Sequence, residues 1–173
     1  WFSGAIEFVH KKNLMKGVSD NEFEPNEKLS RAMIVTILYR MENEPSASFN
    51  KFGDVNADEW YGAAVAWASE NGIVNGVSEN EFAPNDNLTR EQMAAIIYRY
   101  IMFKGGDTSV GENADINSYA DAENISDYAV EAIRYAVASG LMKGDSETTL
   151  NPSGTATRAE TATIIMRLFG IME

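Results

Sequence analysis

The stretch NPSGTATRAETATII, residues 151–165, predicts a polar loop that leads into a helix. Thr157 fits the N-cap position, and Glu160, three residues later, completes a capping box. The alternation of small and branched apolar residues after it suits a helix that buries one face. Capping explains the threonine and the glutamate but leaves Arg158, the residue between them, without a role.

Two further stretches of the chain repeat this arrangement. NDNLTREQMAAII, residues 85–97, places Thr89 and Gln92 in a second capping box. In NEKLSRAMIVTIL, residues 26–38, Ser30 keeps the cap, and the reciprocal acid is missing. Three helices are therefore expected, each with an arginine directly after a hydroxyl residue.

The three stretches belong to three copies of a longer repeat. A shift of 59 residues aligns the first copy on the second, and a further shift of 68 aligns the second on the third, without gaps over 40 columns. Seven columns are identical in all three copies, and in the first copy they are Ala5, Gly17, Ser19, Pro25, Arg31, Ile37 and Arg40. Repeats of this size form architectures in which each unit packs on its neighbours.

Each unit is read as helix, loop and helix. In the second copy the first helix carries an apolar stripe, composed of Trp60, Ala63, Ala64, Trp67 and Ala68. It ends at a column occupied by Asn13, Gly72 and Gly140, residues that suit a left-handed C-cap. The apolar face of the second helix consists of Ile34, Ile37, Leu38 and Met41 in the first copy, and of Met93, Ile96, Ile97 and Tyr100 in the second.

The expected fold is all-α, with three helix-loop-helix repeats packed into one compact body of approximate threefold symmetry. The repeats are placed at residues 1–42, 52–103 and 119–173, and the segments 43–51 and 104–118, rich in Gly, Ser and Asn, are read as linkers. One chain is expected to form the body alone, as a monomer. A short lead-in segment, residues 51–60 and 118–128, opens the second and third repeats. Because the first repeat opens within a helical pattern and lacks this lead-in, the chain is read as part of a longer protein.

Composition excludes several classes of function. The 173 residues carry a net charge of −12, which argues against binding to nucleic acid or to an anionic membrane. With no cysteine and a single histidine, His10, thiolate and histidine metal sites are not expected, and neither is a cofactor. No apolar run is long enough to span a membrane.

The repeated arginine at the first helical position points to an anion. Arg31, Arg90 and Arg158 stand at the positive end of the helix dipole, where a cation is disfavoured by about 0.3–1 kcal/mol. A carboxylate held by the guanidinium and by free helix-start amides would explain the placement. The alternative is an internal carboxylate, for which the acidic column Asp20, Glu79 and Glu147 is available. The second arginine column, Arg40, Arg99 and Arg167, lies at the helix C-terminus, where the dipole alone accounts for it.

These motifs resemble the S-layer homology family, whose repeat contains F-x-D-V, a tryptophan, a G-I/L-x-x-G turn, F-x-P and a TRAE-type helix start. The second copy supplies FGDV at residues 52–55, Trp60, the turn 72–76, Phe82 with Pro84, and Thr89 with Arg90; the third supplies Asp121, the turn 140–144, Pro152 and the full TRAE. The resemblance covers nearly the whole chain. It implies a central three-helix bundle with grooves between repeats. It also implies a non-catalytic, extracellular module at the cell surface, in the S-layer or cell wall of a Gram-positive-type bacterium. Such a module binds secondary cell-wall polysaccharide through a pyruvate ketal.

The resemblance also assigns residues to the carbohydrate site. The arginines Arg31, Arg90 and Arg158 would bind the ketal carboxylate, and a groove aromatic would pack on the sugar. Asp54 and Asp121 would accept sugar hydroxyls or, equally, cap a turn. The remaining candidates are Trp1, Trp60, Tyr128, Gly17, Gly76, Gly144, Lys16 and Lys143, each with a structural alternative: core packing for the aromatics, a left-handed turn for the glycines and a solvated cation for the lysines. Because the copies differ, grooves of unequal affinity are expected.

Three other functions compete with this one. An enzyme is disfavoured, since glycoside hydrolysis needs two placed carboxyls and no recurring pair exists. A calcium site at Asp20, Glu22, Glu24 and Asn26 lacks the EF-hand glycine and terminal glutamate, so a solvated turn is expected. A module for protein interaction and assembly, with no glycan binding, stays open as the alternative function.

Overall fold

The computed structural model describes residues 2–19, 22–48 and 50–173. The six α-helices in these ranges are α1 (Ser3–Lys11), α2 (Arg31–Met41), α3 (Gly62–Glu70), α4 (Arg90–Phe103), α5 (Val130–Ala138) and α6 (Arg158–Met172). Three short 3-10 helices, η1 (Ser109–Gly111), η2 (Ala122–Asn124) and η3 (Asp127–Ala129), lie in the third repeat and the segment before it. Over the described ranges the chain forms isolated β-bridges only, and no helix there has the length and apolarity to cross a membrane. The all-α expectation is confirmed.

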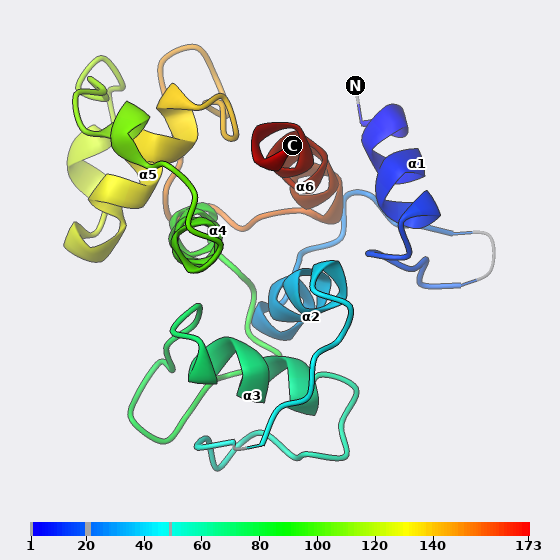
Figure 1. Ribbon diagram of the computed structural model, residues 1–173. Helices are drawn as coiled ribbons and strands as arrows, with labels where there is room; N and C mark the ends of the chain where they lie inside the picture. Colours follow the sequence, from blue (N-terminus) through cyan, green and yellow to red (C-terminus); the bar gives the residue numbers. More distant parts are fainter. Residues whose placement is uncertain (1, 20–21, 49) are drawn as a thin grey trace.

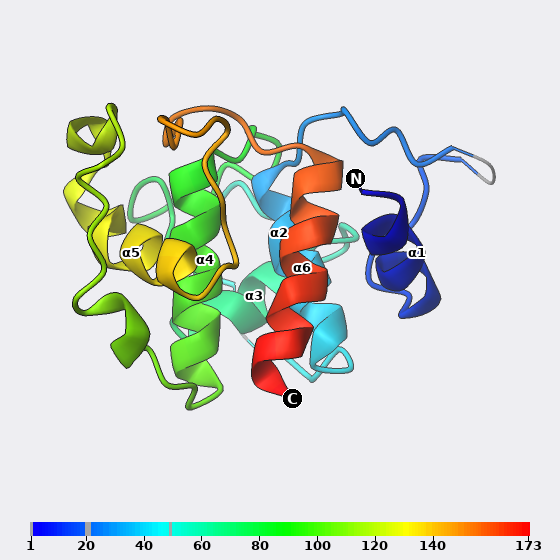
Figure 2. The ribbon, with the colours of Figure 1, turned by 90° about the horizontal axis from the view of Figure 1, so that it is seen from above.

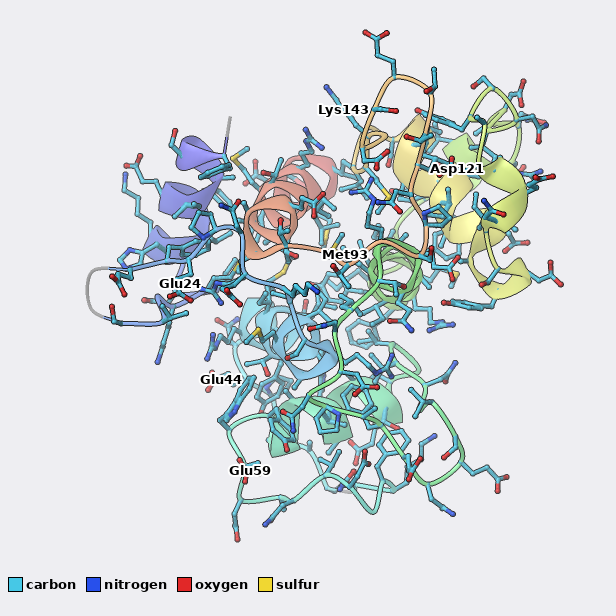
Figure 3. The ribbon with its side chains drawn as sticks, turned by 180° about the vertical axis from the view of Figure 1, so that it is seen from behind. Glu24, Glu44, Glu59, Met93, Asp121 and Lys143 are labelled. Carbon is cyan, nitrogen blue, oxygen red and sulfur yellow. The ribbon has the colours of Figure 1, made fainter. Side chains whose placement is uncertain are left out.

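The second helices of the three repeats form the centre of the molecule. Figure 1 looks nearly along α2, α4 and α6, and α1, α3 and α5 lie outside them in three projecting lobes. Figure 2 shows α4 and α6 side by side in the perpendicular view. Thr161 Oγ1 on α6 lies 3.6 Å from Met93 Sδ on α4, and Met93 is at the centre of Figure 3. The expected three-helix centre is therefore present.

Each outer helix packs on a central helix from another repeat. Helix α3 of the second repeat packs on α2 of the first, α5 packs on α4, and α1 packs on α6. The aromatic contacts Tyr39–Trp67, at 5.7 Å between ring centroids, and Phe8–Phe169, at 5.2 Å, join two of these pairs. The repeats of the sequence are thus interlocked in space, and no repeat is a self-contained packing unit.

Backbone hydrogen bonds close a ring among the three helix starts. Leu29 N donates to Ala156 O at 2.9 Å, Ala156 N to Leu88 O at 2.8 Å, and Leu88 N to Leu29 O at 2.8 Å. These residues occupy one column of the repeat, two positions before each arginine. The threefold symmetry of the whole body stays a prediction, as do the repeat boundaries. In this ring each repeat donates the same bond to the repeat before it.

The second-helix pattern predicts the core well, and the first-helix pattern is right at Ala64, Trp67 and Ala68 but wrong at its first two positions. Met93, Ile96, Ile97 and Tyr100 are all buried, as expected. Trp60, by contrast, is 57% exposed, and Ala63 is exposed as well. Helix α3 begins only at Gly62, so Trp60 precedes it and lies off the buried stripe.

The expected helix caps are confirmed. Thr89 with Gln92 and Thr157 with Glu160 form complete capping boxes. Ser30 accepts from the Met33 amide without a reciprocal bond. The C-cap column is left-handed in every copy, with φ of 55° at Asn13, 69° at Gly72 and 75° at Gly140.

Candidate functional site

Arg31, at the start of α2, reaches into the loop of the second repeat. Its Nε donates to the carbonyl of Phe82 at 2.7 Å and its Nη2 to the carbonyl of Asn75 at 3.0 Å. The guanidinium carbon lies 4.7 Å from the centroid of the Phe82 ring, in cation–π contact. Only 6% of the residue is exposed. The arginine therefore ties the first repeat to the second.

The other two arginines make the same contacts one repeat further on. Arg158 donates from Nε to Phe23 O at 2.8 Å and from Nη2 to Lys16 O at 2.7 Å. Arg90 donates from Nε to Leu150 O at 2.9 Å and from Nη2 to Lys143 O at 2.7 Å. The premise that these arginines lack a structural role is wrong: each satisfies two carbonyls of a neighbouring loop. Sequence reasoning missed this because backbone acceptors leave no trace in residue identity.

Burial has an electrostatic consequence for two of these arginines. Removal from water lowers the pKa of Arg31, and attraction to Asp86 opposes that shift. Burial likewise lowers the pKa of Arg158, opposed by Glu24 and Glu27. A guanidinium titrates so high that both stay charged at neutral pH.

The helix-start amides are already occupied. The amides of Arg31 and Ala32 donate to Asp86 O at 3.0 Å and Pro84 O at 2.9 Å, and the corresponding amides of α4 and α6 bind the loops of the next repeats in the same way. The third amide of each helix is taken by the capping hydroxyl. The expectation that free amides would add hydrogen bonds to a bound anion is therefore wrong. An anion beside these helix starts is therefore not held by their first three amides.

The lead-in aspartates cap a loop. Asp54 accepts from the amides of Phe82 at 2.9 Å and Ala83 at 2.7 Å, and Asp121 accepts from Leu150 at 2.8 Å and Asn151 at 2.7 Å. Both oxygens of each carboxylate are therefore engaged. Of the two roles foreseen for these residues, the structure supports capping, and it acts on a loop about 30 residues away in sequence.

The glycine column serves a tight turn. A Cβ on Gly76 would collide with the carbonyl oxygens of Ser78 and Glu81, and one on Gly144 with those of Ser146 and Thr149. Gly17 is confined by its own turn in the same manner. None of the three has a positive φ, so the expected left-handed turn is wrong at this column. The constraint is steric contact with backbone oxygens.

The lysine column contributes its carbonyl group. Lys16, Asn75 and Lys143 each offer a backbone oxygen to an arginine of another repeat. Lys16 and Lys143 are exposed, and Figure 3 shows Lys143 in the same outer lobe as Asp121. A carbonyl is independent of residue type, which explains why asparagine replaces lysine in the second copy.

A cavity of about 410 Å³ lies beside Arg31. We call it the Arg31 site, and its walls are Arg31 from the first repeat, Asn75, Gly76, Val77, Gln92, Ala95, Ile96 and Arg99 from the second, and Tyr128 from the third. Tyr128 is 53% exposed, and its hydroxyl donates to Glu91 at 3.3 Å, which orients the ring. The volume falls in the range of about 300–1,000 Å³ typical of small-molecule sites.

A second cavity, of about 140 Å³, occupies the corresponding place one repeat earlier. We call it the Arg158 site, and it is lined by Arg158, by Leu14, Met15, Lys16, Leu29, Met33, Ile37 and Arg40 of the first repeat, and by Trp60. Trp60 takes the column of Tyr128, Arg40 that of Arg99, and Met33 that of Gln92. Both cavities thus combine a buried arginine, a second arginine, an apolar floor and an exposed aromatic from three different repeats.

The third arginine is held differently. Arg90 Nη1 lies 2.9 Å from Glu160 Oε1 in an ion pair with side-chain exposures of 6% and 26%. This partly confirms the internal-carboxylate alternative, although the acid is Glu160 and not a member of the column Asp20, Glu79 and Glu147. The aromatic of this copy would be Trp1, which lies outside the described residues, as does Asp20 of the acidic column.

Sequence reasoning missed the second arginine of each cavity. Arg40 and Arg99 were assigned to the helix dipole alone, yet they line the Arg158 and Arg31 sites. Arg40 also donates to Leu14 O at 3.0 Å, and Arg167 to Leu141 O at 3.0 Å. Their identity in all three copies was the available signal.

For metals, the described part of the chain has no group of three or more acidic or histidine side chains placed to hold an ion.

The sequence profile of the S-layer homology domain matches residues 1–32, 51–94 and 118–162, one segment for each repeat. The chain belongs to the S-layer homology family. The matched segments contain all three helix-start arginines, and both aspartates that cap a loop.

Curated relatives of this S-layer homology chain are large surface proteins and enzymes. It is 35% identical over 94% of its length to a surface-layer 125 kDa protein of Lysinibacillus sphaericus, covering 14% of that protein. It is 33% identical over its full length to an amylopullulanase of Thermoanaerobacterium thermosulfurigenes, covering 9% of it. A cellulosome-anchoring protein of Acetivibrio thermocellus is 26% identical over 88% of the chain, which covers 34% of that relative. The chain thus spans about a third or less of these relatives.

Proposed function

We propose that this chain anchors a larger protein to the bacterial cell wall by binding secondary cell-wall polysaccharide at the Arg31 and Arg158 sites. Family membership supports cell-wall anchoring at the cell surface, the role that the names of the surface-layer and cellulosome-anchoring relatives express. As an S-layer homology module it is not expected to be catalytic. The finer proposal is that the ligand is an anionic sugar, whose carboxylate belongs to a pyruvate ketal.

One observation carries the proposal: at each site one guanidinium nitrogen has no hydrogen-bond partner among the described residues. The hydrogen bonds of Arg31 and Arg158 engage Nε and Nη2 only, and none of the bonds between described residues engages Nη1 of either arginine. Neither arginine forms an ion pair within the described ranges. Two neighbouring guanidinium groups, one of them with a nitrogen that no described residue engages, suit a carboxylate.

The rest of each site suits a sugar. An exposed aromatic, Tyr128 or Trp60, offers a flat apolar face to the C–H groups of a pyranose ring and to a ketal methyl group. Ile96 or Ile37 supplies an apolar floor. Because the Arg31 site is about 410 Å³ and the Arg158 site about 140 Å³, the Arg31 site is proposed to bind more tightly.

Calorimetric titration with an N-acetylmannosamine glycoside, with and without its pyruvate ketal, tests the carboxylate. The ketal form should bind at least about tenfold more tightly, since it alone offers a charge-assisted hydrogen bond. Tyr128→Ala should weaken binding at the Arg31 site, whereas Tyr128→Phe, which keeps the ring, should not. Equal binding of both glycosides would remove the ketal from the proposal.

A wall-binding experiment separates this proposal from protein-mediated assembly. Cell walls treated with hydrofluoric acid lose their polysaccharide and should no longer retain the chain. If treated walls retain it as well as intact walls do, the polysaccharide is not the ligand. The alternative function, a protein-interaction module, would then be favoured.

A further inference from the structure

The helix residue three positions after the cap differs among the three arginine sites. It is Gln92 beside Arg31, Met33 beside Arg158 and Glu160 beside Arg90. Only the last is a carboxylate, and its Oε1 accepts from Arg90 Nη1 at 2.9 Å. Nη1 is the nitrogen that the other two arginines leave without a partner in the described chain.

The chemistry of these three side chains explains the difference. Glu160 has two oxygens: Oε2 accepts from the Thr157 amide at 2.8 Å in the capping box, which leaves Oε1 for Arg90. Gln92 has one oxygen, and it accepts from the Thr89 amide at 3.1 Å. Its remaining amide nitrogen is a donor and cannot accept from an arginine. Met33 has no charge and only a weak acceptor.

A second acidic side chain distinguishes the same site. The residue after the turn glycine is Val18 in the first copy and Val77 in the second, where it lines the Arg31 site. In the third copy it is Asp145, next to Gly144 and two residues from the Lys143 carbonyl that Arg90 binds. The third copy thus has carboxylates at two repeat positions where the other copies have none, and Oδ1 of Asp145 accepts from Thr149 Oγ1.

We propose that Glu160 is an internal counter-ion that occupies the Arg90 site, so that this chain offers two anion-binding sites and not three. The inference rests on the proposed function. The side chain at this single helix position selects which sites are open: a carboxylate closes the site, and an amide or thioether leaves it open. Glu160 fills the place that the carboxylate of a ligand takes at the other two sites, and Asp145 adds repulsion against any anion that approaches.

Amide NMR titration with the pyruvylated N-acetylmannosamine glycoside resolves the sites individually. The amides of Gly76, Gly17 and Gly144 occupy one column and report on the Arg31, Arg158 and Arg90 sites. In the unaltered chain, Gly76 and Gly17 should shift with ligand and Gly144 should not. In Glu160→Gln with Asp145→Val, Gly144 should shift too. Glutamine keeps the cap, because Gln92 forms a complete capping box in α4.

The reverse substitution is the matched control. Gln92→Glu supplies the missing oxygen beside Arg31 and should weaken binding at Gly76 by about tenfold or more, with Gly17 unaffected. A Gly144 shift in the unaltered chain, an unresponsive Gly144 in the double variant, or an unchanged Gly76 titration in Gln92→Glu would each overturn the inference while leaving the proposed function intact. If no glycine shifts in any of the proteins, the proposed function fails, and this inference fails with it.

Discussion

Asp54 Oδ2 accepts a hydrogen bond of 2.7 Å from the backbone amide of Ala83, a left-handed residue with φ of 56°. Asp121 makes the same bond to Asn151, whose φ is 52°. Residues other than glycine reach this region only at a conformational cost. The carboxylate therefore holds a strained loop whose carbonyls, at Phe82 and Leu150, receive the buried arginines.

Asp54→Ala is expected to destabilise the protein. It removes both acceptors from the amides of Phe82 and Ala83, at a cost of about 1–3 kcal/mol in the free energy of unfolding. Denaturant unfolding followed by circular dichroism measures the change. Asp58→Ala, an exposed acid four residues on, is the matched control and should be nearly neutral. Equal midpoints for the two variants would contradict the capping role.

Acid should weaken the fold through Asp121. Burial opposes the charged carboxylate, but hydrogen bonds from Leu150 and Asn151 outweigh it, so the pKa of Asp121 is lowered from its ordinary value. A lowered folded-state pKa gives stability that is present above about pH 4 and is lost as the pH falls through the folded value. In the unaltered chain, the free energy of unfolding should therefore decrease as the pH is lowered below about 4. Asp121→Asn should make the free energy of unfolding depend less steeply on pH in this range. An unchanged slope would count against this role of Asp121.

Arg158→Ala is expected to destabilise the protein. The substitution leaves the carbonyls of Phe23 and Lys16 without their donor and removes a cation–π contact at 4.5 Å. We expect a loss of about 2–4 kcal/mol and a fall of about 5–15 °C in Tm by calorimetry. Lys28→Ala, an exposed cation, should leave Tm within about 2 °C. An unchanged Tm for Arg158→Ala would show that the inter-repeat bonds contribute little.

Gly76→Ala and Gly144→Ala should each destabilise the chain, since the new Cβ meets backbone oxygens that cannot move aside independently. The expected loss is about 1–3 kcal/mol for each. Gly170→Ala offers the opposite case: it lies in α6 with open space around the Cβ position, so alanine should raise stability by about 0.5–1 kcal/mol. Thermal unfolding of the three variants gives the comparison. A stable Gly76→Ala protein would mean that the turn can relax.

The sequence predicted those features that depend on local chemistry. Thr157 with Glu160 is a cap that residue types alone identify, and the spacing of Ile34, Ile37 and Leu38 indicates the buried face of α2. The alignment of the three repeats could also be found from the sequence, because Arg31, Arg90 and Arg158 share a column. From that register the family resemblance followed, and the family profile confirmed it.

Features that depend on which repeat meets which could not be predicted. Nothing in the residues near Arg31 indicates that its partners are carbonyls at positions 75 and 82, since every residue has a carbonyl. The exposure of Trp60 follows from a helix that begins two residues later, at Gly62, and not from its apolar character. Glu160 was assigned a single role as a cap, because a sequence does not show that its second oxygen faces another repeat.

The contacts between the first and third repeats also constrain the order in which the chain can fold during synthesis. Arg158 binds carbonyls of residues 16 and 23, and α1 packs on α6. A ribosome releases the first repeat long before residue 158 exists, so the loop at Phe23 and the buried side of α1 must wait for partners more than 100 residues downstream. Such long-range closure slows folding and leaves an early intermediate with exposed apolar surface. Fragments that end before α6 should therefore be prone to aggregation during synthesis, and the completed chain should unfold as one cooperative unit.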